Sequence, residues 1–200
     1  MQANARVLKP VLFITLGLPL VWLVYAIVRE LSEPGAVLGA DPGEAVVLFL
    51  GEWNIRILLL TLCVSTARRL LRTPAIGGYR RMIGLFAFSY AVMHMFSYLG
   101  FLAGFEWRII QEDFVERTYI TVGIGAVFLL LPLAFTSTRG WQRRLGQRWR
   151  RLHKLVYPAV GLGLVHLLWL TKDDYAEPLL YCAIFAGLMA ERLIDWRRRT

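Results

Sequence analysis

The sequence predicts an all-α integral membrane protein, a bundle of six transmembrane helices with both termini in the cytoplasm. Three observations carry this prediction. The 200 residues are 57% hydrophobic and have a mean hydropathy of +0.52, which is too apolar for a soluble domain of this size. Six apolar segments approach the roughly 20 residues that a helix needs to cross a bilayer. Positive charge also alternates from one connection to the next.

The six spans are expected within a single domain that covers residues 1–200. Their approximate bounds are 10–28, 45–67, 81–103, 118–135, 155–171 and 178–194. The first segment has no charged residue, and no small-residue cleavage site follows it, so we interpret it as a retained helix rather than a signal peptide. The second is the weakest because it contains Glu52 and Arg56. No long linker separates the spans.

The basic residues predict the orientation in the membrane. With this set of spans, 18 of the 23 Lys and Arg residues fall on one side: Arg6, Lys9, Arg68, Arg69, Arg72, Arg80, Arg81, Arg139, Arg143, Arg144, Arg148, Arg150, Arg151, Lys154, Arg192, Arg197, Arg198 and Arg199. Cytoplasmic loops carry such an excess. The opposite loops are acidic. The net charge of +9 therefore indicates contact with membrane lipids, and we expect no nucleic-acid partner.

The connection at 139–152 predicts an amphipathic helix that lies on the cytoplasmic leaflet. Trp141, Leu145, Trp149 and Leu152 recur at helical spacing, and arginines fill most of the positions between them. Such a helix anchors to anionic lipid. Docking of a cytosolic electron donor is the alternative role.

Two of the three histidines are expected at the same depth. His94 follows the cytoplasmic end of the third span by about 13 residues, and His166 follows His153 by the same number, which is about 20 Å of helix. Two parallel helices would then present imidazoles at one level, as a haem iron held from both faces requires. The alternative is that both histidines are structural, each bonded to a neighbouring helix. Nearby glycines would let a flat macrocycle approach the backbones: Gly161, Gly163, Gly100 and Gly104.

His153 lies at the cytoplasmic mouth of the fifth span. On an ideal helix it would point about 140° away from His166, so the two share a face only if the helix is distorted. Pro158 can supply such a kink. His153 is therefore a candidate ligand for a second, inner haem, or else it faces the interface and has another role.

Arg56 and Glu52 are ionisable residues within a span, spaced i, i+4 on one helix face. An internal ion pair is the simplest interpretation, and a contact from Arg56 to a haem propionate is the sharper one. Cys63 and Cys182 both fall inside spans, so the sequence implies neither a disulfide framework nor a CxxC metal motif.

Four stretches resemble a known family. They read "GEWNIRILLLTL" from Gly51, "MHMFSYL" from Met93, "YITVGIGAVFLLLPLAFTST" from Tyr119 and "RRLGQRWRRLHKLVYPAVGLGLVHLLWL" from Arg143. The chain resembles, over essentially its whole length, the MsrQ (YedZ) family of haem-binding membrane subunits. These subunits belong to the ferric-reductase-like transmembrane group and serve the periplasmic repair of methionine sulfoxide in proteins.

The resemblance implies a haem b electron conduit in the bacterial inner membrane. The donor would be the quinone pool or a cytosolic flavin reductase, and the acceptor a periplasmic molybdopterin methionine-sulfoxide reductase that performs the substrate chemistry. FMN is carried over by resemblance alone. The wider group often holds two haems between histidine pairs, whereas this chain has Arg80 where a second histidine of the third helix would stand. We therefore predict one haem between His94 and His166, with His153 available to a second.

Two other functions remain open at this stage. A cytochrome b anchor of a different oxidoreductase would have the same histidines. A non-redox carrier of a metal or small solute would use them as transient ligands, but it would require acidic or cysteine ligands beside His94 and His166. Glu52 is the one carboxylate well inside a predicted span.

Overall fold

The computed structural model describes residues 2–71 and 78–198, and within those ranges the chain forms helices without strands. Arg72 and Arg199, which count among the predicted cytoplasmic charges, lie outside the described residues. The α-helices are α1 (Gln2–Ser32), α2 (Pro42–Leu70), α3 (Arg80–Ser97), α4 (Trp107–Glu116), α5 (Thr118–Phe135), α6 (Arg139–Leu145), α7 (Gln147–Leu152), α8 (Val156–Leu170) and α9 (Ala176–Arg197). A π-helical turn, Tyr98–Leu102, extends α3, and a 3₁₀ turn, His153–Leu155, joins α7 to α8.

Five helical segments are long and apolar enough to cross a membrane: Leu8–Ser32, Pro42–Leu70, Arg80–Leu102, Thr118–Phe135 and Gln147–Leu170. The prediction of an all-helical, multi-pass membrane protein is confirmed to that extent. The sixth predicted span corresponds to α9, which is not among the five. Its C-terminal half carries Glu191, Arg192 and Asp195, which shorten its apolar stretch. Six spans and the side of each terminus stay predictions.

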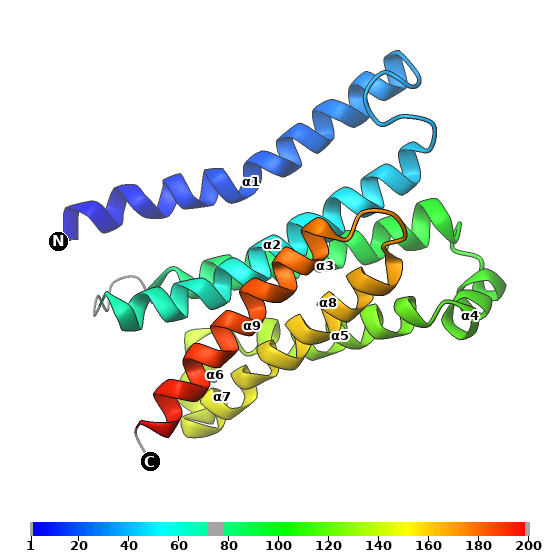
Figure 1. Ribbon diagram of the computed structural model, residues 1–200. Helices are drawn as coiled ribbons and strands as arrows, with labels where there is room; N and C mark the ends of the chain where they lie inside the picture. Colours follow the sequence, from blue (N-terminus) through cyan, green and yellow to red (C-terminus); the bar gives the residue numbers. More distant parts are fainter. Residues whose placement is uncertain (1, 72–77, 199–200) are drawn as a thin grey trace.

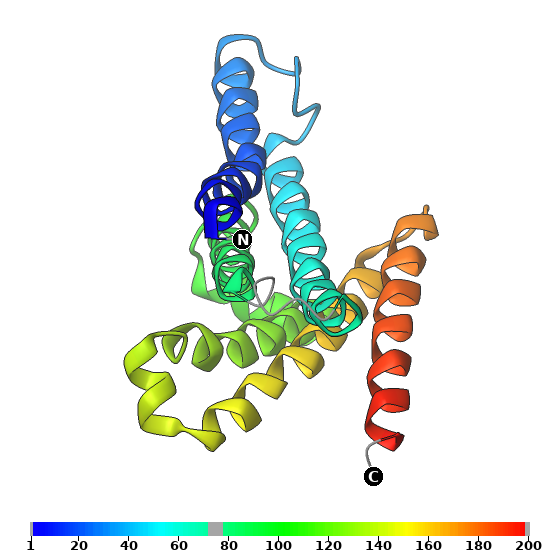
Figure 2. The same ribbon diagram turned by 90° about the vertical axis from the view of Figure 1, so that its left-hand side faces the viewer.

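Two helix pairs form the centre of the molecule. The most extensive packing joins α2 to α3 and α5 to α8, and α3 then packs on α5 (Figure 1). Figure 2 shows α5 and α8 spreading apart toward the end where α6 and α7 connect them. Helix α1 lies along the side of the α2–α3 pair and leaves much of its apolar surface exposed. One polar contact attaches it, because buried Tyr90 on α3 donates a 2.9 Å hydrogen bond to the Leu16 carbonyl.

The two ends of the bundle differ. Both termini lie at the end that holds α6 and α7, whereas α4 lies at the opposite end (Figure 1). At that opposite end the buried carboxylate of Glu30 accepts backbone N–H bonds from Gly35, Val37 and Leu38. Three backbone donors of the loop between α1 and α2 are thus satisfied by one side chain.

Two local features differ from expectation. The segment expected as one interfacial helix at 139–152 is two short helices, because Gly146 between them adopts φ +51°, a conformation that favours glycine. Helix α4 lies where we expected only a loop. Its buried Asp113 accepts a 2.7 Å hydrogen bond from the Tyr98 hydroxyl and pairs with Arg117 at 3.1 Å. These contacts hold α4 across the ends of α3 and α5.

Candidate functional site

The structure brings His94 and His166 together. His94 lies on α3 and His166 on α8, and their ring centroids are 6.0 Å apart with the planes inclined at 82°. Both residues are partly buried. The depth match expected from the spacing along two parallel helices therefore corresponds to a direct approach of the two imidazoles.

Each imidazole is oriented by a carbonyl of the neighbouring helix. His94 Nδ1 lies 2.9 Å from the Val47 carbonyl oxygen on α2, and His166 Nδ1 lies 2.7 Å from the Tyr119 carbonyl oxygen on α5. A carbonyl oxygen only accepts, so Nδ1 carries the proton in both rings. The neutral ring then keeps its lone pair on Nε2. Metal-ligating histidines are commonly held in this way.

The two rings fit a shared iron. Imidazoles that bind one metal ion from opposite sides, at metal–nitrogen distances of about 2 Å, have centroids roughly 6 Å apart, which matches the observed spacing.

Asn54 adds a further observation about the neighbouring helix α2. Its side-chain oxygen is buried with no hydrogen-bond partner among the described residues, and it follows Gly51 by three positions on the same side of α2. Buried polar atoms rarely lack partners, so this oxygen is available to accept a hydrogen bond from a ligand.

Two glycines that the sequence interpretation missed lie against the rings. A Cβ built on Gly51 would be 3.0 Å from His94 Cε1, and one on Gly123 would be 2.7 Å from His166 Nδ1. Among the predicted glycines, Gly161 has nothing within 4 Å, and Gly163 meets only the Ile55 side chain at 3.4 Å.

The remaining predicted glycines do not meet the histidines either. Gly100 faces the Phe105 ring at 3.5 Å, and Gly104 adopts φ +56° with nothing within 4 Å. The packing role of these four glycines stays a prediction. A signal was present for the missed pair, since Gly51 and Gly123 each stand one helical turn after the carbonyl that holds a histidine.

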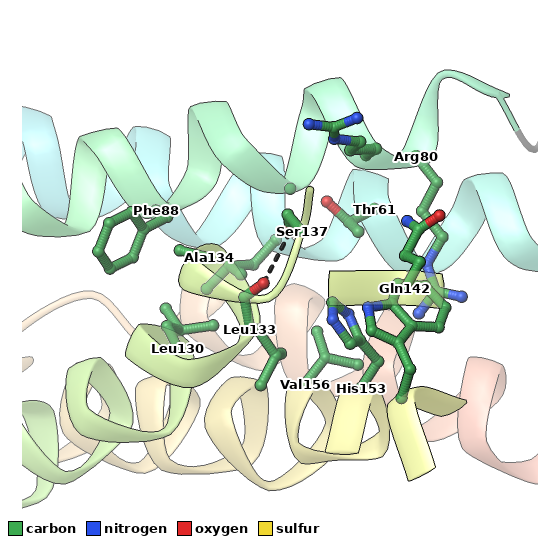
Figure 3. Close-up of a pocket in the computed structure, with 14 residues that line it drawn as sticks. Thr61, Arg80, Phe88, Leu130, Leu133, Ala134, Ser137, Gln142, His153 and Val156 are labelled. Carbon is green, nitrogen blue, oxygen red and sulfur yellow. Dashed lines mark hydrogen bonds between the residues drawn. The ribbon is translucent and has the colours of Figure 1, made fainter. Parts of the chain in front are cut away.

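His153 lies apart from the other two histidines, in a cavity of about 180 Å³. It occupies the 3₁₀ turn before α8, so the helix is distorted at this point, as the sequence required for an inward-facing ring. Its ring packs on Trp149 with centroids 4.0 Å apart, and its Nε2 is 3.2 Å from the Thr136 hydroxyl. Figure 3 shows His153 and Val156 on one side of the cavity and Thr61 and Arg80 on the other.

Arg56 connects α2 with α9. Its guanidinium contacts Glu52 at 3.1 Å, Glu177 at 2.6 Å and the Tyr181 hydroxyl at 2.7 Å. The internal pair with Glu52 is present. A propionate at Arg56 would join two carboxylates already bound there, and that role stays a prediction. Arg56, followed by Tyr181, holds the pKa of Glu177 below its usual value.

The described residues contain no group of three or more His, Cys, Asp or Glu side chains that would hold a metal ion. Cys63 and Cys182 are free thiols. Two facing imidazoles suit a cofactor that supplies the rest of its metal's coordination, as a porphyrin does.

Comparison with known proteins identifies the family. Residues 50–164 match the family described as Ferric reductase like transmembrane component. A protein-methionine-sulfoxide reductase heme-binding subunit MsrQ from Rhodospirillum rubrum is 47% identical, over 94% of this chain and 88% of that protein. The MsrQ of Caulobacter vibrioides is 42% identical, over 92% of this chain and 90% of its own length.

A third relative, the MsrQ of Xanthomonas axonopodis pv. citri, is 46% identical over 80% of this chain and 73% of that protein. No solved structure matches the chain. The family match covers more than half of the chain, and the relatives cover most of it. The chain therefore belongs to the MsrQ family of ferric-reductase-like transmembrane proteins.

Proposed function

We propose that this protein is a haem b electron-transfer subunit of the bacterial inner membrane. It passes electrons from the quinone pool or a cytosolic flavin reductase to a periplasmic molybdopterin methionine-sulfoxide reductase, which repairs oxidised periplasmic proteins. The observation that carries the proposal is the pair of imidazoles, 6.0 Å apart and each bonded through Nδ1 to a carbonyl. The relatives are haem-binding subunits of a methionine-sulfoxide reductase by name, which supports both the haem and the reductase.

The chain's own residues account for much of this role. The Val47 and Tyr119 carbonyls fix the tautomer and orientation of the rings, and a hydrogen bond at Nδ1 makes the opposite nitrogen a stronger ligand. The surrounding helices α2, α3, α5 and α8 bury an apolar core that excludes water. When bound, haem supplies reversible one-electron storage. Substrate chemistry then belongs to the partner protein, so the chain is an electron-transfer subunit rather than a complete enzyme.

The orientation of the chain in the membrane is inferred from its charges. The end with α6 and α7 is rich in arginine, which supports a cytoplasmic location for it and for both termini. Helix α9 then completes a sixth span, attached to α2 through Arg56 and through Arg69, which pairs with Glu191. The His94–His166 pair lies toward the periplasmic end, where electrons leave.

His153 and its cavity supply the electron-entry side in this proposal. The lining includes Arg80 and Arg81, together with the polar Thr61, Ser137 and Gln142. Such a lining suits the acidic groups of a second haem, for which His153 is the available ligand. On the facing side the lining contributes Arg80, which stays protonated in proteins and cannot act as a metal ligand. FMN is included on family resemblance alone.

The two alternatives fare differently. A cytochrome b anchor of another oxidoreductase would share the imidazole geometry, so the partner must decide between them. A metal or solute carrier has less support, because no described cluster of carboxylates or thiols accompanies the histidines.

The decisive experiment purifies the full chain from haem-replete cells and measures the reduced-minus-oxidised spectrum. We expect a haem b spectrum, and we expect the reduced protein to be reoxidised when the periplasmic reductase and methionine sulfoxide are added together. A colourless preparation would contradict the haem. Reoxidation that ignores the reductase would favour the other-oxidoreductase alternative.

A further inference from the structure

The site is built twice from the same three parts. In the α2–α3 pair the parts are a carbonyl at Val47, a glycine at Gly51 and His94. In the α5–α8 pair they are a carbonyl at Tyr119, a glycine at Gly123 and His166. The carbonyl precedes the histidine by 47 residues in both pairs, and the glycine follows the carbonyl by one helical turn in both. The chain meets each imidazole with the same local geometry.

The glycine is the part that sets how closely the ring approaches the neighbouring helix. A Cβ on Gly123 would stand 2.7 Å from His166 Nδ1 and 3.0 Å from Cε1. A Cβ on Gly51 would stand 3.0 Å from His94 Cε1 and 3.1 Å from Nδ1. The atoms in conflict belong to the ring edge that faces the carbonyl. Any larger residue must therefore push the ring away from its acceptor.

We infer that Gly51 and Gly123 are positioning residues that hold the two imidazoles on their carbonyl acceptors and aim both Nε2 atoms at the shared iron. This inference rests on the proposed haem function. A side chain at either position would lengthen the Nδ1–H···O bond and rotate the ring. Loss of that bond weakens the nitrogen donor, and a weaker donor favours the reduced iron.

Alanine variants test the inference directly. Gly51→Ala and Gly123→Ala are compared with Gly125→Ala, which lies on the same helix as Gly123 and whose Cβ meets only Leu162 Cδ1, at 3.6 Å. Gly187→Ala on α9, with nothing within 4 Å, reports the effect of helix propensity alone. The readouts are haem per folded chain, retention of haem during titration with a haem-binding competitor, and the midpoint potential.

We expect Gly123→Ala to retain haem about 10- to 100-fold more weakly than the wild type, as for other changes beside a metal ligand. We expect Gly51→Ala to show a smaller loss, because its contacts are longer. Haem that remains should have a more positive midpoint potential. A tenfold change in the oxidised-to-reduced ratio corresponds to about 59 mV for one electron. The control variants should match the wild type.

Wild-type haem content and potential in both Gly51→Ala and Gly123→Ala would overturn the inference while leaving the proposed function intact. A wild type without haem would instead contradict the proposed function. If Gly123→Ala does not fold, the milder Gly51→Ala decides the question through its potential.

Discussion

The His94–His166 pair and the His153 cavity stand at opposite ends of the same two helix pairs, and they are completed differently. Toward the α4 end, each helix pair contributes one imidazole whose Nδ1 is bonded to a backbone carbonyl. Toward the α6–α7 end, only α8's side contributes an imidazole, and its Nε2 lies against the Thr136 hydroxyl. On α3, Arg80 stands where a second histidine would be expected, across the cavity from His153.

The difference teaches that repetition of the helix pairs does not by itself make a metal site. A ligand must appear in both copies, with its coordinating nitrogen unoccupied. The α4 end presents two imidazoles that face each other, whereas the α6–α7 end presents one. The inner level instead places arginines around a small cavity, an arrangement suited to an anionic group.

The largest expected effect comes from the outer pair. His94→Ala and His166→Ala should each remove most of the haem b absorbance, because one imidazole is lost from a site that uses two. The pyridine haemochrome assay of purified protein measures this. His153→Ala is the matched comparison and should keep the outer component. Equal losses in all three variants would remove the distinction between the two ends.

A smaller effect on haem content is expected from adding a second histidine to the cavity that holds His153. Arg80→His places an imidazole opposite His153 in the same cavity, and we expect haem per chain to rise above the wild-type value. The added component should disappear in the double variant with His153→Ala. Arg151→His, at an exposed position on α7, is the control for a general effect of an extra histidine. No gain over that control would show that the two inner positions do not face a common space.

Removing the contacts that attach α4 to α3 and α5 should cause a moderate loss of stability. Asp113→Asn removes a buried charge that accepts from Tyr98 and pairs with Arg117. We expect a cost of about 1–3 kcal/mol, measured as a lower melting temperature in detergent. Glu112→Gln removes an exposed pair to Arg108 at 3.7 Å and should change little. Equal melting temperatures for the two variants would refute the anchoring role of Asp113.

The smallest effect concerns Glu177, whose side chain is 47% exposed. Arg56 lowers the pKa of Glu177 from its usual 4.5, so the folded state gains stability above that value and loses it as the pH falls through the lowered pKa. Glu177→Gln should melt slightly below the wild type near pH 7. The gap should narrow near pH 4 and below. A gap that widens in acid would reverse the assigned sign.

The sequence predicted the elements that apolar length alone determines. Five of the six expected spans appear, and His94 and His166 meet because both follow the same end of parallel helices by a similar number of residues. Helix α4 was missed because its ten residues bury little beyond Asp113. The break at Gly146 was missed because arginine and tryptophan spacing continues through it.

The contacts of Gly51 and Gly123 depend on which helices become neighbours, and periodicity within one helix does not contain that information. The same limit applies to Arg56. Its pair with Glu52 is local and was expected, whereas its contacts to Glu177 and Tyr181 come from α9, more than a hundred positions away. Charge pairs within one helix can be predicted from their spacing in the sequence, whereas partners on distant helices cannot.

The two imidazole planes are nearly perpendicular, at 82°, and each is held by its own helix pair rather than by contact with the other. Perpendicular axial planes leave two iron d orbitals close in energy. A ferric haem bound by both rings at this angle would be expected to give a strongly anisotropic low-spin resonance. The angle at which the two helix pairs hold their imidazoles would then determine the largest g value in the electron paramagnetic resonance spectrum of the frozen protein.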